Sequence, residues 1–383
     1  MYRVVLLRSN PINPDPAVER IASALAESGW NVTIIGWDRD EKYDCKEDVL
    51  DLGSKTARVI RFGIPAVFSG GIKKNLGPLF KFEKRLSDWL RKNKNEYDVI
   101  HAFDFDTGFT AKQIAKKYNK GFVYHILDFY AADRFCEDSF GYNIVKSLEF
   151  SAINNADATI ICTEARKRQI AGSNPNLLEI VHNTPGYSAP TSDCSFKVSD
   201  DKIKIAYVGC FEPNRFLKEL ISIVIEDSRL ELHIGGFGLY EEYVEECSKK
   251  CDRIVFYGRL PYDKVLLLEE KCDIISAVYN PEVPNNRFAA PNKLYESMML
   301  SKPVIMCENT GWDEVVESNK IGVIAKPTED GIKEALEKLI QTKSSWNEMG
   351  KRSNELYQNS YSWDIMNERV KKLYERIYQG EAK

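Results

Sequence analysis

Glycine residues follow three apolar segments in the second half of the chain, and their placement suits the binding of a diphosphate. A glycine at a strand end lets backbone N–H groups approach phosphate oxygens, and the N-terminus of the next helix adds a positive field. A tight turn between strand and helix is the alternative explanation for any single one of them. The segments and their glycines are 203–208 with Gly209, 230–234 with Gly235 and Gly236, and 254–257 with Gly258.

Two cationic residues follow the first of these glycines. Arg215 and Lys218 lie where the next helix is expected to begin, and both side-chain types bind phosphate. The alternative is that they are solvated residues on a helix surface. The run Gly-Gly-Phe-Gly at 235–238 lacks the third glycine of a G-x-G-x-x-G motif, so the sequence does not predict a dinucleotide fingerprint.

A helix expected to begin near Pro291 carries further polar candidates. Asn292, Lys293 and Glu296 fall within its first turns, close to the edge of the sheet that the glycines define. A carboxylate there can accept two hydroxyl groups of a ribose or another sugar. Alternatively, Glu296 is an acid favoured only by the dipole of the helix start.

Alternating strand and helix patterns surround these residues and position them. Residues 2–7 form an apolar run typical of a buried parallel strand, a helical apolar period over 18–26 follows, and 31–35 is a second strand. Such βαβ units recur on both sides of a polar segment at 187–201, which predicts two doubly wound domains with ligands at the carboxyl ends of their strands. The other predicted strands are 59–62, 99–103, 122–126 and 159–162, and then 274–278 and 303–307.

Composition limits the class of protein. The chain has 383 residues, 53 Lys and Arg against 57 Asp and Glu, and 43% hydrophobic residues, which favours a globular protein of two or three domains and argues against a nucleic-acid binder. Nine cysteines without framework spacing indicate reduced thiols in the cytoplasm. No apolar run approaches the ~18 residues that would span a bilayer. We therefore expect a cytoplasmic protein.

One basic segment stands out from this near-neutral background. Residues 73–94 contain eight basic and two acidic residues. Leu79, Phe82, Leu86, Trp89 and Leu90 recur on one helical face within the segment. A basic amphipathic helix can lie on anionic lipid, which would make the protein peripheral on the inner face of the plasma membrane. The alternative is a helix packed on the core with a solvated outer face.

Several motifs, taken in their order along the chain, resemble those of the retaining nucleotide-sugar glycosyltransferases of the GT-B fold, the group 1 or family 4-like glycosyltransferases. The resemblance covers nearly the whole chain. The motifs are Asp-Val-Ile-His-Ala-Phe-Asp at 98–104, His-Ile-Leu-Asp at 125–128, Tyr-Val-Gly at 207–209, Leu-His-Ile-Gly-Gly-Phe-Gly at 232–238, Pro-Asn-Lys-Leu-Tyr-Glu at 291–296 and Lys-Pro-Val-Ile at 302–305.

The resemblance implies an α/β GT-B fold with a cleft between two facing Rossmann-like domains. The first domain (1–190) would bind the acceptor, the second (201–360) would bind the donor, and a terminal helix (361–383) would cross back to the first. A nucleotide sugar would be the donor and a saccharide or lipid-linked saccharide the acceptor, in the synthesis of cell-surface polysaccharide or glycolipid, with no cofactor, metal or nucleic acid.

The resemblance also assigns roles to individual residues. Asp104 and Asp106 have the letters of a metal-binding Asp-x-Asp, but they follow a strand of the first domain, where acceptor contacts or a solvated loop are expected. His125 would contact the transferred sugar, or it could be a buried structural histidine. The implied catalytic residues are Arg215, Glu296 and His125; the donor-binding residues are Gly209, Lys218, Gly236, Phe237, Gly238, Asn292, Lys293 and Leu294; the acceptor-side residues are Asp104, Asp106 and Asp128.

The chain departs from the family pattern at two positions. Phe288 stands where the family's E-x7-E pair has its first acid, and Cys210 stands where an arginine usually follows the glycine. The departure at Phe288 leaves open a nucleotide-sugar-binding protein without transfer activity. A sugar-nucleotide epimerase of similar two-domain shape, which needs no acceptor, is a further alternative.

Overall fold

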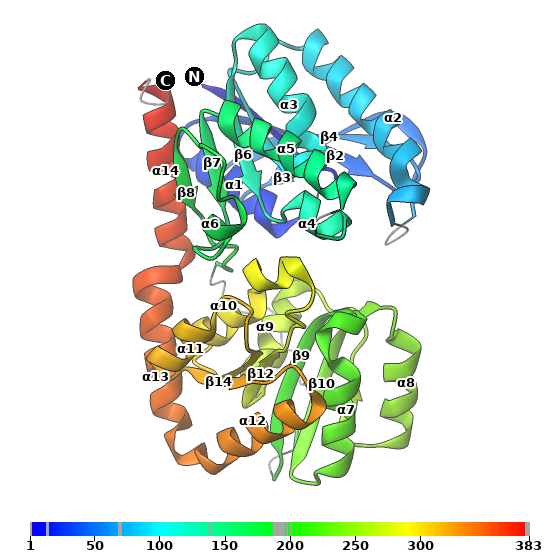
Figure 1. Cartoon of the computed structure of the whole chain (residues 1–383), viewed down its shortest axis with the longest axis vertical. Coiled ribbons are helices and arrows are strands. Elements are labelled where there is room, and N and C mark those ends of the chain that lie inside the picture. The colour runs from blue at the N-terminus through cyan, green and yellow to red at the C-terminus, as the bar shows by residue number, and fades with distance from the viewer. Residues whose placement is uncertain are drawn as a thin grey trace. The chain divides into compact units, whose positions relative to one another are not determined.

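The computed structural model forms two compact units (Figure 1). It describes residues 2–12, 15–67, 71–137, 139–186, 196, 198–199 and 201–379, without the side chains of 71–73. The first unit comprises Met1–Asn183 together with Met366–Lys383, and the second comprises Thr184–Ile365. Most of the polar segment predicted as a linker, 187–201, lies outside the described residues.

The first unit is built on an eight-stranded sheet in the order β3-β4-β2-β1-β5-β6-β7-β8, parallel except for the β3–β4 pair. Every strand predicted for this half is present, with ends within three residues of those expected. Its strands are β1 (Arg3–Leu7), β2 (Asn31–Asp38), β3 (Tyr43–Asp51), β4 (Thr56–Gly63), β5 (Val99–Phe103), β6 (Gly121–Ile126), β7 (Ala158–Ile161) and β8 (Leu178–Ile180). Its helices are α1 (Pro16–Glu27), α2 (Gly71–Lys92), α3 (Phe105–Tyr118), α4 (Tyr130–Arg134), α5 (Phe140–Asn155), α6 (Arg166–Gln169) and most of α14 (Trp363–Tyr378).

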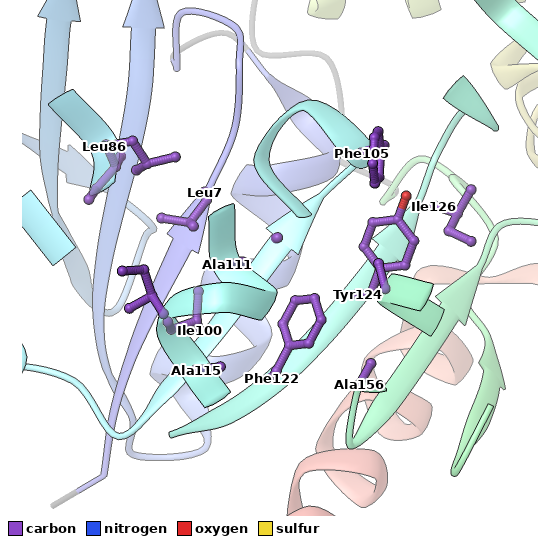
Figure 2. Packing of buried hydrophobic residues seen from close by; sticks show 14 of the residues in the cluster. Leu7, Leu86, Ile100, Phe105, Ala111, Ala115, Phe122, Tyr124, Ile126 and Ala156 are labelled. Carbon is purple, nitrogen blue, oxygen red and sulfur yellow. The ribbon is translucent and has the colours of Figure 1, made fainter. Parts of the chain in front are cut away.

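Helix α2 packs its apolar face on the core of this unit, beside the strands and α3 (Figure 2). Phe82, Leu86 and Leu90 follow each other at four-residue spacing and are fully buried, and the ring of Phe82 stacks on Trp37 at a centroid distance of 5.0 Å. This is the face for which the sequence allowed either lipid binding or packing on the core. Core packing is therefore the correct interpretation of that face, because its side chains already lie inside the protein.

Removal of the Phe82 ring is expected to destabilise the first unit. Truncation of a fully buried phenylalanine costs about 3–5 kcal/mol, since the lost contacts leave a cavity. We expect Phe82→Ala to lower the free energy of unfolding by this amount in chemical denaturation. Phe80→Ala is the matched control: Phe80 is 67% exposed on the same helix, so its loss should change stability by about 0.5 kcal/mol or less.

The second unit is built on a six-stranded parallel sheet in the order β11-β10-β9-β12-β13-β14. Strand β14 was not predicted, and the other five were. The strands are β9 (Ile203–Phe211), β10 (Leu230–Gly238), β11 (Ile254–Phe256), β12 (Ile274–Ala277), β13 (Val304–Cys307) and β14 (Gly322–Ala325). The helices are η1 (Pro213–Arg215), α7 (Leu217–Glu226), α8 (Glu241–Lys250), α9 (Tyr262–Lys271), η2 (Pro284–Phe288), α10 (Asn292–Met299), α11 (Asp313–Asn319), α12 (Glu329–Gln341), η3 (Lys343–Ser345), α13 (Trp346–Leu356) and η4 (Tyr357–Tyr361).

Strands β9 and β10 run past the ends predicted for them, and their glycines explain how. Gly209 and Gly236 are register partners inside the paired strands. A Cβ atom on Gly236 would lie 1.9 Å from the carbonyl oxygen of Gly209, and one on Gly238 would lie 2.8 Å from the backbone nitrogen of Phe211. Gly236 and Gly238 also have φ values of +142° and +143°. Close backbone approach, rather than a strand-to-helix turn, is therefore why these positions are glycine.

Candidate functional site

A cluster of two cations lies at the carboxyl ends of β9 and β12. The amine of Lys293 lies against Gly209, because a Cβ atom on that glycine would be 2.7 Å from Lys293 Nζ. Lys293 Nζ is 5.3 Å from the ring centroid of Tyr207 and 5.8 Å from that of Tyr279. Arg215 Cζ lies 3.7 Å above the Tyr279 ring. The structure thus brings together Gly209, Arg215 and Lys293 around Tyr279, and we call these four residues the cationic cluster.

Arg215 is held in place by the loop that follows β12. Its Nη1 atom donates to Oδ1 of Asn286 over 3.4 Å. Asn286 lies in η2 and is 5% exposed, and its amide nitrogen donates to the carbonyl of Asn280. The backbone N–H of Asn280 donates in turn to the backbone carbonyl of Asn214, the residue before the arginine. This ring of contacts makes Asn286 a positioning residue that sequence reasoning did not identify.

Four predicted donor-binding residues are not part of the cationic cluster. The amine of Lys218 lies 4.1 Å from the ring centroid of Tyr240 and 4.9 Å from that of Tyr243. Leu294 is fully buried within an apolar cluster, and its backbone N–H donates to the carbonyl of Pro291. Phe237 lies beneath Arg259, whose Cζ is 4.5 Å from the ring centroid. Asn292 is exposed at the first residue of α10.

Glu296 lies one turn after Lys293 on α10 and is 4% exposed. Its Oε1 atom accepts a hydrogen bond of 3.0 Å from the hydroxyl of Tyr262, at the start of α9. A buried carboxylate needs such partners, because burial removes its hydration. The helix-dipole interpretation alone does not explain Glu296, since an acid held only by the dipole would remain solvated. Phe288, one of the two departures from the family pattern, is the last residue of η2 and is partly buried.

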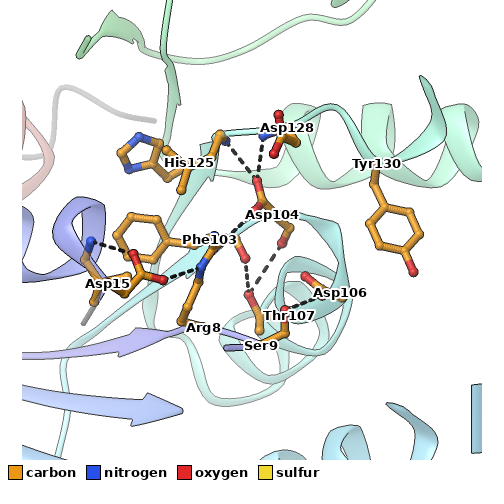
Figure 3. Close-up of polar contacts among 12 residues, drawn as sticks. Arg8, Ser9, Asp15, Phe103, Asp104, Asp106, Thr107, His125, Asp128 and Tyr130 are labelled. Carbon is orange, nitrogen blue, oxygen red and sulfur yellow. Dashed lines mark hydrogen bonds and ion pairs between the residues drawn. The ribbon is translucent and has the colours of Figure 1, made fainter. Parts of the chain in front are cut away.

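A second polar group occupies the carboxyl ends of β1, β5 and β6 in the first unit (Figure 3). Oδ1 of Asp104 accepts the backbone N–H groups of Leu127 and Asp128 at 2.9 and 3.0 Å. The guanidinium of Arg8 pairs with Asp104 and, over 2.9 Å, with Asp15. Burial raises the pKa of Asp104 to about 6, and the charge of Arg8 opposes that shift. Asp104, at a φ of +59°, thereby ties the three strand ends together.

Two buried polar atoms beside this group lack a partner within the described part of the chain. The hydroxyl of Ser9 donates to Oδ2 of Asp106, and the carbonyl of Ser9 accepts from Arg39 over 2.8 Å. Oδ1 of Asp106 and Nε of Arg39 are the unmatched acceptor and donor. A hydroxyl group of a ligand can both donate and accept, so it can satisfy atoms of this kind. Asp128 lies 3.9 Å from Arg166, with its side chain 57% exposed.

His125 belongs to a row of hydrogen-bonded rings. Its Nδ1 lies 3.2 Å from Nε2 of His101, and Nδ1 of His101 lies 2.7 Å from the hydroxyl of Tyr374 on α14. Burial lowers the pKa of His101 to about 3 and that of His125 well below its ordinary value, so both rings are neutral. Nε2 of His125 is buried without a partner in the described residues. Tyr374 was not anticipated, because 273 residues separate it from His101.

Metal-binding clusters and membrane-spanning helices are both absent from the residues that the structure describes. Within them, no group of three or more His, Cys, Asp or Glu side chains could hold a metal ion. No helix within them has the length and apolar character to cross a bilayer. The cysteines described, including Cys247 and Cys251 on and just after α8, are free thiols.

Two Rossmann-like α/β units, one of them with cations at a glycine-lined sheet edge, define a protein of the GT-B class. Family models agree: residues 17–184 match glycosyltransferase family 4, and residues 191–362 match the group 1 glycosyl transferases. The two models together cover most of the chain, which therefore belongs to the group 1 and family 4 glycosyltransferases. No curated protein matches it in sequence.

Solved structures share the fold at low sequence identity. Sucrose-phosphate synthase from Thermosynechococcus elongatus superposes with a TM-score of 0.76 at 18% identity, over 99% of this chain and 100% of its own. HepE from Anabaena in complex with UDP superposes with a TM-score of 0.67 at 15% identity, over 98% of this chain and 100% of its own. A candidate UDP-N-acetylglucosamine 2-epimerase from Listeria monocytogenes superposes with a TM-score of 0.63 at 12% identity, over 99% of this chain and 97% of its own.

Proposed function

We propose that the protein transfers a sugar from a nucleoside-diphosphate sugar to a saccharide or lipid-linked acceptor, in the synthesis of cell-surface polysaccharide or glycolipid. The cationic cluster is the observation that carries the proposal. A diphosphate is bound by fixed positive charge and by backbone that it can approach closely. Arg215 and Lys293 supply the charge, and Gly209 supplies the backbone. The UDP complex of HepE, which has the same fold, makes UDP the first nucleotide to test.

The proposed chemistry depends on negative charge that develops as the glycosidic bond breaks. That charge appears on the β-phosphate of the leaving nucleoside diphosphate. Arg215 and Lys293 would stabilise it, since cations fixed in advance need no rearrangement during the reaction. These two side chains would do the work that a metal ion does in other transferases. Retention of the anomeric configuration is proposed from the family resemblance.

The polar atoms of the first unit are proposed to bind the acceptor. Oδ1 of Asp106 and Nε of Arg39 are buried and lack partners among the described residues, and hydroxyl groups of the acceptor can supply what each needs. Nε2 of His125 is also buried without a partner among them and is proposed to contact the transferred sugar. Asp104 would act indirectly, by fixing the strand ends that carry these groups. Asp128 is proposed as an exposed contact at the same edge.

Loss of the Asp106 carboxylate is expected to weaken acceptor binding selectively. We expect Asp106→Ala to raise the acceptor KM about tenfold or more, because one hydrogen bond to a charged group contributes about 1.5–3 kcal/mol. The donor KM should change little. Steady-state kinetics with each substrate varied in turn tests this, and an equal rise in both KM values would contradict the assignment.

Thermal-shift measurements with a panel of nucleoside diphosphates and nucleotide sugars test the proposed donor. Stabilisation by one diphosphate and its sugar would identify the base, since a ligand that binds only the folded state raises its stability. Turnover of that donor with a cell lipid extract then tests transfer. Binding without turnover would favour the nucleotide-sugar-binding alternative that Phe288 suggests.

An epimerase is the second candidate, because the Listeria protein has the same fold. An epimerase converts a nucleotide sugar without an acceptor. Incubation of the donor with the protein alone therefore separates the two functions. A new nucleotide sugar formed without acceptor would favour the epimerase, and product formed only with acceptor would favour the transferase.

We further propose that helices α2, α3 and α5, which pack side by side, touch an anionic membrane surface. Leu76 and Phe80 are exposed on α2 among the cations of the basic segment, including the exposed Lys81 and Lys84. Phe109 on α3 is 37% exposed. Exposed apolar side chains among lysines suit anionic lipid, since each cation near the surface contributes about 1 kcal/mol. On α5 the exposed apolar row is Phe140, Ile144 and Leu148.

Binding to vesicles containing an anionic phospholipid is expected at low salt and should weaken at high salt, as the charges are screened. Sedimentation of the protein with such vesicles measures it. Phe80→Ala and Phe140→Ala should each weaken the binding, because both remove exposed apolar area. Absence of binding at low salt would contradict the membrane proposal and leave the donor proposal untouched.

A further inference from the structure

A buried carboxyl group on α9 has no role in the chemistry described so far. Glu269 is fully buried. Neither of its oxygens accepts a hydrogen bond from a donor in the described part of the chain. An isolated carboxylate does not persist in such surroundings, because burial penalises its charged form heavily. The group must therefore carry a proton or share one.

Glu296 is the neighbour with which Glu269 can share a proton. Tyr262 and Glu269 are seven residues apart on α9, which places them on the same side of the helix. The hydroxyl of Tyr262 donates to Glu296, so this side of α9 faces α10, and the two helices pack together. A side-chain hydrogen bond with Glu296 is among the causes that raise the pKa of Glu269, which makes the two carboxyl groups neighbours. A hydrogen bond between two carboxyl groups requires one proton between them.

The charged groups around this pair favour a single negative charge. Burial and the neighbouring Glu296 raise the pKa of Glu269 well above its ordinary value, and Lys293 opposes that shift. Cys272, one turn after Glu269 on the same side, has its own pKa raised, chiefly by burial, so its thiol is neutral. Tyr262 contributes a neutral hydroxyl. One shared negative charge beside one lysine is thus the arrangement that these groups support.

We infer that Glu269 is a positioning residue of the donor site. Its protonated carboxyl group donates a hydrogen bond to Glu296 and keeps that carboxylate oriented to accept hydrogen bonds from hydroxyl groups of the nucleotide sugar. The inference rests on the proposed donor role of Glu296. Tyr262 holds one oxygen of Glu296, and Glu269 fixes the orientation of the same group from α9. Loss of the proton at alkaline pH would set two negative charges against each other and release Glu296.

Two substitutions separate the proton from the shape of the side chain. Glu269→Gln keeps a hydrogen-bond donor of the same size that does not ionise, whereas Glu269→Leu fills the space with no donor. We expect Glu269→Gln to bind UDP-glucose within about threefold of the wild type at pH 7, and Glu269→Leu to bind at least about tenfold more weakly, as loss of one charge-assisted hydrogen bond implies. Equal binding by the Leu variant and the wild type would overturn the inference.

The pH dependence of stability is a second measurement that needs no ligand. Because the pKa of Glu269 is raised in the folded state, this group binds a proton more tightly there than in the unfolded chain, so its contribution to stability should fall as pH rises above about 4.5. Glu269→Gln should make that fall shallower. An unchanged pH profile would overturn the shared proton. A shallower profile without binding of UDP-glucose by any variant would support the proton and overturn the donor role.

Discussion

Arg215→Ala is expected to lower the rate of sugar transfer about 10²- to 10³-fold and to leave the fold intact. Loss of one preorganised group that stabilises developing charge typically has an effect of this size. The side chain lies over Tyr279 and is held by Asn286, so its charge is fixed before the donor arrives. Initial rates at saturating donor and acceptor measure the change.

Two further variants give this result its meaning. Arg215→Lys keeps a positive charge but loses the planar donor fork, so it should recover only part of the rate. Arg229→Ala removes an arginine of the same unit that is ion-paired to Asp227 and Glu337 and half exposed, and it should react at the wild-type rate. Transfer by Arg215→Ala within about threefold of the wild type would place the leaving-group site elsewhere.

Gly236→Ala is expected to destabilise the second unit by about 2–6 kcal/mol, since a backbone clash and a strained φ each cost about 1–3 kcal/mol. Its Cβ atom would meet the carbonyl of Gly209 at 1.9 Å, at a φ of +142°. The paired ends of β9 and β10 must separate to admit it. The amine of Lys293 lies against Gly209. A shift of Gly209 should therefore disturb the cationic cluster and weaken nucleotide binding as well.

Gly258→Ala is the matched control for this prediction. Gly258 also has a positive φ, +65°, but a Cβ atom there would have no neighbour within 4 Å. Only the conformational cost of about 1 kcal/mol remains. Chemical denaturation of both variants measures the difference. Equal destabilisation by the two substitutions would show that the close approach of Gly236 to Gly209 is not what excludes a side chain at position 236.

The sequence predicted the fold well where strands are buried, and less well where they are not. Continuous apolar runs marked the central strands of both sheets, because strands covered on both faces must be apolar. Strand β3 was missed because this edge strand is almost wholly exposed and polar. The ends of β9 and β10 were placed too early because glycines interrupt their apolar runs, although there the glycines keep the strands paired.

The donor site was predictable only in part. The order of motifs identified Gly209, Arg215 and Lys293, which the structure brings together. It also selected Leu294, whose side chain lies in the core, because a motif does not show which face of a helix each residue occupies. Asn286 and Tyr279 escaped notice because their contacts depend on how distant loops fold together.

Calorimetric titration of UDP into the wild type and Arg215→Ala tests the central claim most directly. We predict binding at one site in the wild type and binding weaker by about 10- to 100-fold in the variant, the range expected for loss of a charge-assisted hydrogen bond. If UDP binds both proteins equally, or if no nucleoside diphosphate binds the wild type, the cationic cluster is not a donor site and the proposed transfer is contradicted.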